Sequence, residues 1–112
     1  MTDINELTTL VNKFRDDREW RQFHNPKDLA ISLSLEVSEL LENFQWKTSE
    51  EAIKVNNENL KEELADVLIY ALMLNDELGF DLEEIVKDKL LKNDEKYPVD
   101  KSKGKKEKYN SI

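Results

Sequence analysis

The fold of this chain is decided by LADVLIYALML, residues 64–74. On a helix this segment is apolar on every side apart from Asp66, and a helix that is apolar all round is enclosed by other helices. The whole sequence has only two glycines and two prolines, with no alternating strand pattern between them. We therefore expect one all-α domain, with this segment as its central helix.

Two further helices are predicted before the central one. Residues 3–21 place apolar side chains at helical spacing. Asn25 is a capping residue and Pro26 suits the first helical position, so a second helix begins there and is expected to end near Trp46. Residues 47–63 form a polar stretch that leads into the central helix.

A fourth helix is predicted after the central one. Gly79 suits a helix C-cap, and Asp81 with Glu84 is a variant of the capping box. The helix is expected to run to about Lys96, where a Tyr-Pro dipeptide stops it. We assign residues 1–98 to the helical domain. The remaining residues, 99–112, read as a basic C-terminal tail that is either flexible or a lid over a bound ligand.

The charge distribution limits the partners that the chain can have. The formal net charge is -8, although five lysines lie in the last thirteen residues. An acidic body disfavours duplex nucleic acid and membrane surfaces as partners, whereas an anionic small molecule can bind through a divalent cation. The absence of cysteine excludes disulfides and thiolate zinc sites. No apolar run reaches the ~20 residues of a membrane span, and a cytoplasmic protein is the expectation.

Two pairs of acids interrupt the most apolar parts of the second and central helices. Glu36 and Glu39 lie three residues apart among leucines, and Glu63 and Asp66 repeat that spacing. Side chains at this spacing share one helix face. If the two helices pack antiparallel, four carboxylates converge, and their repulsion and desolvation require either protonation or a cation. Oxygen ligands of this kind suit Mg²⁺ or Mn²⁺.

Two alternatives for these acids stay open on the spacing alone. Acid pairs three residues apart are common on solvated helix faces that bind nothing. A di-iron carboxylate bundle uses similar geometry, but it needs Glu-x-x-His on two helices. The single histidine, His24, does not follow that spacing, so iron is disfavoured.

The same acids occur in a pattern that resembles a family signature. Glu-x-x-Glu in LEVSEL is followed after 23 residues by Glu-x-x-Asp in EELADVL, which is similar to the EExxE and ExxD motifs of the MazG-like all-α NTP pyrophosphatases. Leu35 replaces the first glutamate, so the resemblance is to the short, single-domain branch that contains the dCTP pyrophosphatases. Three blocks follow the order of that branch: REWRQFHNPKDLAISLSLEVSELLENFQWK, ELADVLIYAL and KLLKNDEKYP.

The resemblance covers about Phe14 to Tyr109 and implies both a fold and an activity. The fold is a four-helix MazG-like bundle. The activity is Mg²⁺-dependent hydrolysis of a nucleoside triphosphate, dCTP-like by this branch, to a nucleoside monophosphate and pyrophosphate. One of the metal ligands, or an acid beside them, would orient or deprotonate the attacking water. The ligands that the resemblance implies are Glu36, Glu39, Glu63 and Asp66.

The resemblance also implies positions that contact the nucleotide. Each has a structural alternative, because aromatic residues pack in cores, histidines brace turns and lysines lie on solvated helix faces. Trp20 reads more as a core residue than as a contact. The implied positions are His24, Trp46, Tyr70, Lys89, Asn93, Lys96 and Tyr97.

The size of the chain bears on its assembly. Four helices of this composition leave more apolar surface than 112 residues cover, which predicts that oligomerisation completes the bundle. The resemblance implies a homotetramer built as a dimer of dimers. Two other functions stay open: a non-catalytic helical oligomerisation module, and an enzyme similar to phosphoribosyl-ATP pyrophosphohydrolase, which should lack the QFH and FQW blocks seen here.

Overall fold

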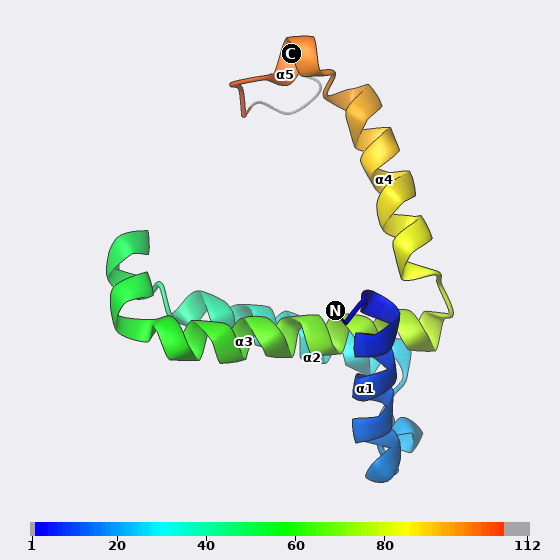
Figure 1. Cartoon of the computed structure of the whole chain (residues 1–112). Coiled ribbons are helices and arrows are strands. Elements are labelled where there is room, and N and C mark those ends of the chain that lie inside the picture. Colours follow the sequence, from blue (N-terminus) through cyan, green and yellow to red (C-terminus); the bar gives the residue numbers. More distant parts are fainter. Residues whose placement is uncertain (1, 107–112) are drawn as a thin grey trace. The chain divides into compact units, whose positions relative to one another are not determined.

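The computed structural model of the chain describes residues 2–106. Every regular element in that part of the chain is a helix, which confirms the predicted all-α class. The chain divides into two compact units, Met1–Gly79 and Phe80–Ile112. The elements in chain order are α1 (Ile4–Asp17), η1 (Trp20–Phe23), α2 (Pro26–Glu42), α3 (Ser49–Leu78), α4 (Leu82–Lys96) and α5 (Val99–Ser102) (Figure 1).

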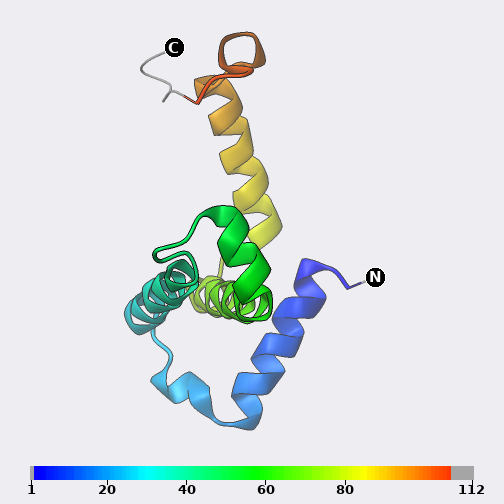
Figure 2. The same ribbon diagram turned by 90° about the vertical axis from the view of Figure 1, so that its left-hand side faces the viewer.

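The antiparallel pair of α2 and α3 is the centre of the first unit. The N–H of Asp28 donates to Oδ1 of Asn25 at 2.9 Å, and Pro26 is the first helical residue, so α2 begins as predicted. Leu29 on α2 and Met73 on α3 are both buried. The two helices lie side by side in Figure 1 and in the rotated view of Figure 2.

Asparagines join α2 to the first part of α3. The side-chain amide of Asn56 donates to the carbonyl of Asn43 at 2.8 Å, and that of Asn59 donates to Oδ1 of Asn43 at 2.8 Å. Asn43 is itself buried. Asn56 has non-helical backbone angles, φ -111° and ψ 20°, so the long helix is kinked there. These bonds fix the register between the two helices.

The boundaries on either side of this join differ from the sequence expectation. α2 ends at Glu42 and not near Trp46, because the next residues form a turn in which Trp46 takes a left-handed φ of 62°. The polar residues 47–63 are mostly helical. Thr48 caps this helix through its hydroxyl oxygen, which accepts from the N–H of Glu51 at 3.2 Å. A cap together with charged helix formers was enough to start α3 early.

α1 is shorter than the helix expected over residues 3–21. It ends at Asp17, and Glu19 takes a left-handed φ of 55° before the 3₁₀ turn η1. This reversal brings the ring of Trp20 back onto that of Phe14, edge to face, with 5.5 Å between centroids. The aromatic contact favours the turn over continued helix.

The second unit contains α4 and α5. α4 begins as predicted, since the N–H of Glu84 donates to Oδ1 of Asp81 at 3.1 Å, and it ends at Lys96. Within the predicted basic tail, the four residues Val99–Ser102 form α5. Residues 107–112 of that tail lie outside the described residues. The division at residue 98, and the role of the tail as a flexible end or a lid, stay predictions.

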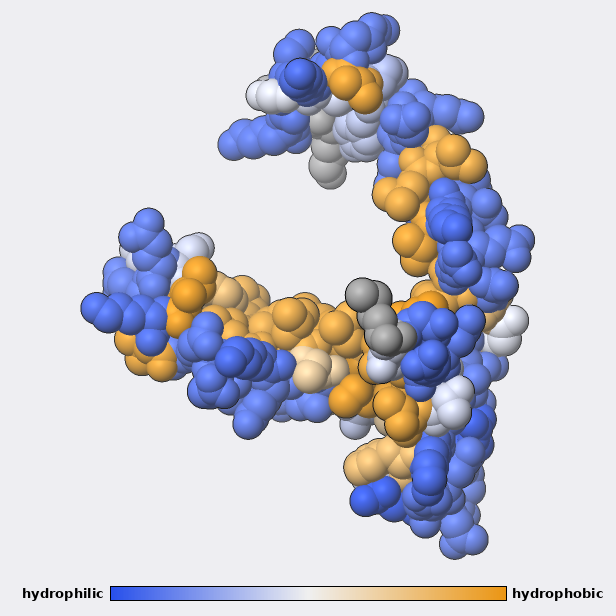
Figure 3. Space-filling view, viewed as in Figure 1, coloured by the Kyte–Doolittle hydropathy of each residue, from blue (hydrophilic) through white to orange (hydrophobic). Residues whose placement is uncertain are grey.

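Little of the apolar material in residues 2–106 is buried. The buried apolar side chains are Leu29, Ala52, Leu72 and Met73. Figure 3 shows apolar side chains gathered at the surface over the region of α2 and α3. Large exposed ones on these two helices include Ile31, Leu35, Leu41, Leu64 and Leu68.

Among residues 2–106, no helix has both the length and the hydropathy that crossing a bilayer requires.

Candidate active site

Three glutamates from two helices meet between α2 and α3. One carboxylate oxygen from each of Glu36, Glu39 and Glu63 lies within 4.8 Å of the other two. Glu36 and Glu63 are half-buried, whereas Glu39 is exposed. The packing of α2 on α3 therefore brings together three of the four carboxylates that were expected to converge if these helices packed antiparallel. We call these three residues the acid cluster.

Two acids of the cluster, Glu36 and Glu63, hold their protons more tightly than ordinary glutamates do. Burial raises the pKa of Glu36 to about 7, helped by a hydrogen bond with Glu39 and by the charges of Glu39, Asp66 and Glu63. Burial also raises the pKa of Glu63, with a further contribution from Glu39. Like charges at this separation disfavour the ionised form unless a cation is bound between them.

Two oxygens of the acid cluster lack partners. Oε2 of Glu36 and Oε2 of Glu63 are buried and have no hydrogen-bond partner among the described residues. A buried carboxylate oxygen without a partner is costly, so each such atom calls for a ligand. Carboxylate oxygens alone form the donor set, which fits a hard divalent cation such as Mg²⁺ or Mn²⁺.

Asp66 lies outside the cluster of three but is electrically coupled to it. Its charge contributes to the raised pKa of Glu36 and of Glu63. The half-buried Asp66 also lines a cavity of about 440 Å³ on the α1 side of α3. The fourth predicted ligand therefore stands between the acid cluster and a cavity, and its part in binding a metal stays a prediction.

The cavity is walled by apolar and aromatic side chains, with Asp66 as the exception. Its volume is in the range of small-molecule sites. Burial, followed by the charges of Glu36, Asp66 and Glu39, raises the pKa of Tyr70, so its phenol keeps its proton and can donate a hydrogen bond. The lining residues come from α1, η1 and α3: Leu10, Val11, Phe14, Trp20, Asp66, Ile69, Tyr70 and Met73.

The α1 and η1 side of this cavity was not foreseen as part of a site. The sequence predicts that Leu10, Val11 and Phe14 belong to the apolar face of a helix and that Trp20 is a core residue. Trp20 is 40% exposed and lines the cavity. The signal that could have identified it is the pair of aromatic residues, Phe14 and Trp20, which flank a run of charges too polar to continue a buried helix face.

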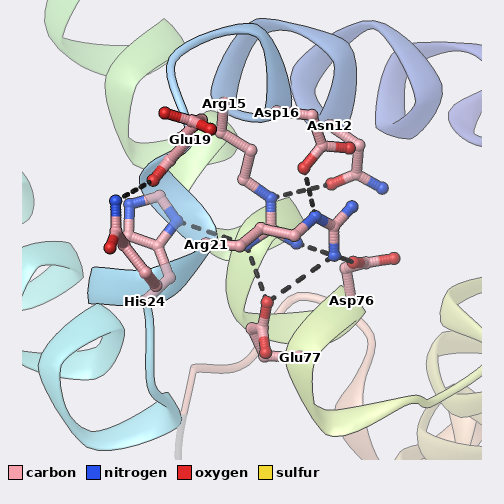
Figure 4. Close-up of polar contacts among 9 residues, drawn as sticks. Asn12, Arg15, Asp16, Glu19, Arg21, His24, Asp76 and Glu77 are labelled. Atoms are coloured by element: carbon pink, nitrogen blue, oxygen red, sulfur yellow. Dashed lines mark hydrogen bonds and ion pairs between the residues drawn. The ribbon is translucent and has the colours of Figure 1, made fainter.

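His24 lies in a different set of contacts. Its Nδ1 is 3.2 Å from Nη1 of the buried Arg15 (Figure 4). The centroid of its ring lies 6.4 Å from that of Trp20. Arginine only donates, so Nδ1 accepts and the neutral ring carries its proton on Nε2. Burial and the charge of Arg15 lower the pKa of His24. These contacts are those of the structural alternative, a brace for the turn, and its contact with a base stays a prediction.

Trp46 is presented to solvent. Its side chain is 92% exposed and its backbone is left-handed, with φ 62°. It is therefore not part of the core of this chain, which was the alternative to a nucleotide contact. A left-handed backbone at a bulky residue is strained, and such strain is found at functional positions.

The remaining predicted contacts lie on α4 and at its C-cap, in the second unit. Asn93 is half-buried, and its carbonyl accepts the N–H of Tyr97 at 2.8 Å where the helix ends. The spacing of Lys89, Asn93 and Lys96 places these three on successive turns of one helix face. Their participation in a site with the acid cluster stays a prediction. The four residues are Lys89, Asn93, Lys96 and Tyr97.

Comparison with known proteins gives consistent results. The profile of the MazG-like family matches residues 31–112. dCTP pyrophosphatase 1 of Mus musculus is 37% identical over 114 residues, covering 97% of this chain and 67% of the relative, and that of Homo sapiens is 35% identical over the same shares. A pyrophosphatase from Archaeoglobus fulgidus has a similar crystal structure, with a TM-score of 0.80, 44% identity, and coverage of 88% of this chain and 94% of that one. This chain belongs to the MazG-like family.

Proposed function

We propose that the protein is a Mg²⁺-dependent pyrophosphohydrolase that cleaves deoxynucleoside triphosphates, dCTP-like ones by preference, to the monophosphate and pyrophosphate. The enzyme class has the broadest support. The relatives that this chain matches over 67% of their length are dCTP pyrophosphatases. A protein of similar solved structure is a pyrophosphatase. The chain is a nucleotide pyrophosphohydrolase.

One observation carries the metal dependence. One carboxylate oxygen each of Glu36 and Glu63 is buried without a hydrogen-bond partner among the described residues, and the pKa of Glu36 is raised to about 7. A divalent cation held here would supply the missing positive charge and would allow a triphosphate to bind, whose own charge this acidic site would otherwise repel. Glu36, Glu39 and Glu63 would hold it, with Asp66 as the fourth candidate ligand.

The residues around the reacting phosphate have two tasks. They keep the attacking water in line with the α-phosphorus, and they accept its proton as the new oxygen–phosphorus bond forms. The bond between the α-phosphorus and the bridging oxygen breaks at the same time, and pyrophosphate leaves with that electron pair. A carboxylate of the acid cluster, Asp66 or an acid beside them accepts the proton.

The cavity is suited to the nucleoside part of the substrate. It is adjacent to the acids through Asp66, and its aromatic walls at Trp20 and Tyr70 can pack against a planar base and a sugar. The choice of a cytosine base is supported by the names of the relatives alone. Trp46 is the candidate for a further stacking face, because it is exposed and strained.

The assembly we propose is a homotetramer built as a dimer of dimers. The apolar side chains that α2 and α3 leave exposed form a surface larger than isolated apolar residues explain. A second copy of the same surface is a suitable cover, since most oligomers of soluble chains are symmetric. Light scattering across a range of protein concentrations tests this, and a monomer at all concentrations would contradict it.

A pyrophosphate-release assay tests the function. The purified chain is incubated with each of the common ribo- and deoxyribonucleoside triphosphates, with millimolar Mg²⁺ or with EDTA. We expect release from deoxynucleotides, fastest with dCTP, and none in EDTA. Glu62→Gln is the matched control for acid-cluster variants, because Glu62 is an exposed neighbour on the same helix. Absence of release from every nucleotide would contradict catalysis and favour the non-catalytic oligomerisation module.

A further inference from the structure

Arg15 is the single buried residue of α1. Its side chain is completely inaccessible, whereas the apolar residues of the same helix stay open: Leu10 is 60% exposed and Phe14 45%. Arginine is almost never fully buried unless it is paired. The one fully buried side chain that α1 packs against the rest of its unit is therefore polar, and its contacts are centred on this guanidinium.

The guanidinium of Arg15 is bonded on three sides (Figure 4). Its Nη2 donates to Oδ2 of Asp76 at 2.6 Å, and its Nη1 donates to Oε1 of Glu77 at 2.9 Å. Its Nε donates to Oδ1 of Asn12 at 3.1 Å, and Nη1 also contacts Nδ1 of His24 at 3.2 Å. One planar fork thus ties α1, the end of η1 and α3 together with fixed directions. We call these five residues the Arg15 clamp.

The acids of the clamp sit where a helix disfavours them. Asp76 and Glu77 lie in the last turn of α3, close to the negative end of its dipole, and that turn contains no basic residue. The positive charge has to come from elsewhere. Arg15 supplies it from α1, and Arg21 of η1 adds a bond to Asp76 at 3.0 Å. The end of α3 is therefore built to receive α1 and η1.

The clamp lies beside the cavity. Phe14 precedes Arg15 and lines the cavity, as does Trp20 in η1, while Met73 lies one helical turn before Asp76 on α3. The acid cluster, in contrast, is built from α2 and α3, and Arg15 is not among its residues. The wall of the cavity and the metal ligands are thus held by different contacts.

We propose that Arg15 is a positioning residue for the nucleotide. By fixing α1 and η1 on α3, it sets the distance between the Phe14–Trp20 wall and Tyr70, and so the affinity for the nucleoside, without touching it. Metal binding at the acid cluster does not depend on it. This inference rests on the proposed pyrophosphohydrolase function.

The test is the variant Arg15→Lys, which keeps the positive charge but loses the planar guanidinium and its set of N–H donors. KM for the best deoxynucleotide is expected to rise about tenfold or more, because a small displacement of the Phe14–Trp20 wall weakens binding of the nucleoside. The value of kcat is expected to change less. The rise in melting temperature on adding Mg²⁺ without nucleotide is expected to match that of the wild type. Lys13→Met is the matched control, because it removes the exposed salt bridge between Lys13 and Asp17 on the same helix. It should leave KM unchanged.

A second variant separates positioning from stability. Arg15→Met combined with Asp76→Asn and Glu77→Gln removes the fork without leaving buried charges unpaired. At a temperature well below its melting point, we expect KM to stay raised. Wild-type KM in this triple variant, or in a folded Arg15→Lys protein, would overturn the assignment while leaving the proposed function intact. A wild-type protein that releases no pyrophosphate from any nucleotide would overturn both.

Discussion

Asp66 and Tyr70, one helical turn apart on α3, line the same cavity, and the charge of Asp66 also raises the pKa of Tyr70. The same aspartate acts on Glu36 and Glu63 in the acid cluster. A single turn of helix thus joins the acids to an apolar cavity, so a ligand with a charged end and a planar end can engage both.

Removing one carboxylate should abolish turnover and stabilise the metal-free fold. In Glu63→Gln a buried, repelled acid becomes a neutral amide, so the melting temperature in EDTA is expected to rise, while the rise caused by Mg²⁺ is lost. Pyrophosphate release should fall to background, as in Glu39→Gln. Glu62→Gln should behave as the wild type in both measurements. Wild-type activity in both acid-cluster variants would remove these residues from the proposed site.

The stability of the metal-free protein should depend on pH through Glu36. Its pKa of about 7 lies above the ordinary 4.5, so the folded chain binds the proton more tightly than the unfolded chain does. This contribution is complete below pH 4.5 and is lost as the pH rises through about 7. The wild type loses this contribution as the pH rises, whereas Glu36→Gln has no such group to ionise. In EDTA, the melting temperature of the wild type should therefore fall relative to that of Glu36→Gln from about pH 5 to about pH 8.

Mg²⁺ should reverse that loss. A cation competes with the proton for the same carboxylates, so its stabilising effect is expected to be larger at about pH 8 than at about pH 5.5. Thermal melts with and without millimolar Mg²⁺ at both pH values measure it. An equal shift at both pH values would show that the ion binds elsewhere.

Substitutions of Trp46 should change both the affinity for the nucleotide, through loss of the ring, and the stability of the fold, through the strained backbone. Loss of the ring in Trp46→Ala is expected to raise KM about tenfold or more, since stacking on one base is worth about 1–3 kcal/mol. Trp46→Gly should raise KM equally but melt several degrees higher than the alanine variant, because glycine relieves about 1–2 kcal/mol of left-handed strain. Unchanged KM in both would leave Trp46 as a position for subunit contact.

His24 should matter for stability through Arg15. In His24→Ala a buried guanidinium loses an acceptor, at a cost of about 1–3 kcal/mol, so the melting temperature is expected to fall by several degrees. Asparagine can place its Oδ1 near the position of Nδ1, and His24→Asn is expected to recover much of that loss. If His24 also reads the base edge, both variants will narrow the ratio of kcat/KM between best and worst nucleotide. An unchanged ratio limits His24 to bracing the turn.

The parts of this structure that depend on local pattern could be predicted from the sequence. Asn25 and Asp81 cap their helices as expected, and the spacing of Glu36, Glu39 and Glu63 places them on facing sides of two helices. Spacing sets the face of a helix but not the side-chain direction, so it did not reveal that Asp66 also borders a cavity.

The parts that depend on distant contacts could not be predicted. Residues 18–21 contain no helix breaker, and the left-handed Glu19 occurs together with tertiary contacts that local pattern does not show, the packing of Trp20 on Phe14 and the ion pair of Arg21 with Asp16. Arginines are usually exposed, and the acids that bury Arg15 lie 61 and 62 positions away. The cavity wall depends on both, so it was missed. The cytoplasmic location and the tetramer stay predictions.

The asparagine join between α2 and α3 has a consequence for the order in which the chain folds. Asn43 bonds to residues 13 and 16 positions ahead, so the α2–α3 hairpin closes over a short loop, whereas the Arg15 clamp must close a loop of more than sixty residues. We therefore expect the hairpin to form first and α1 to dock later. Amide hydrogen exchange should be slowest in α2 and α3 and fastest in α1, so that the acid cluster exists in partly folded chains that have no cavity beside it.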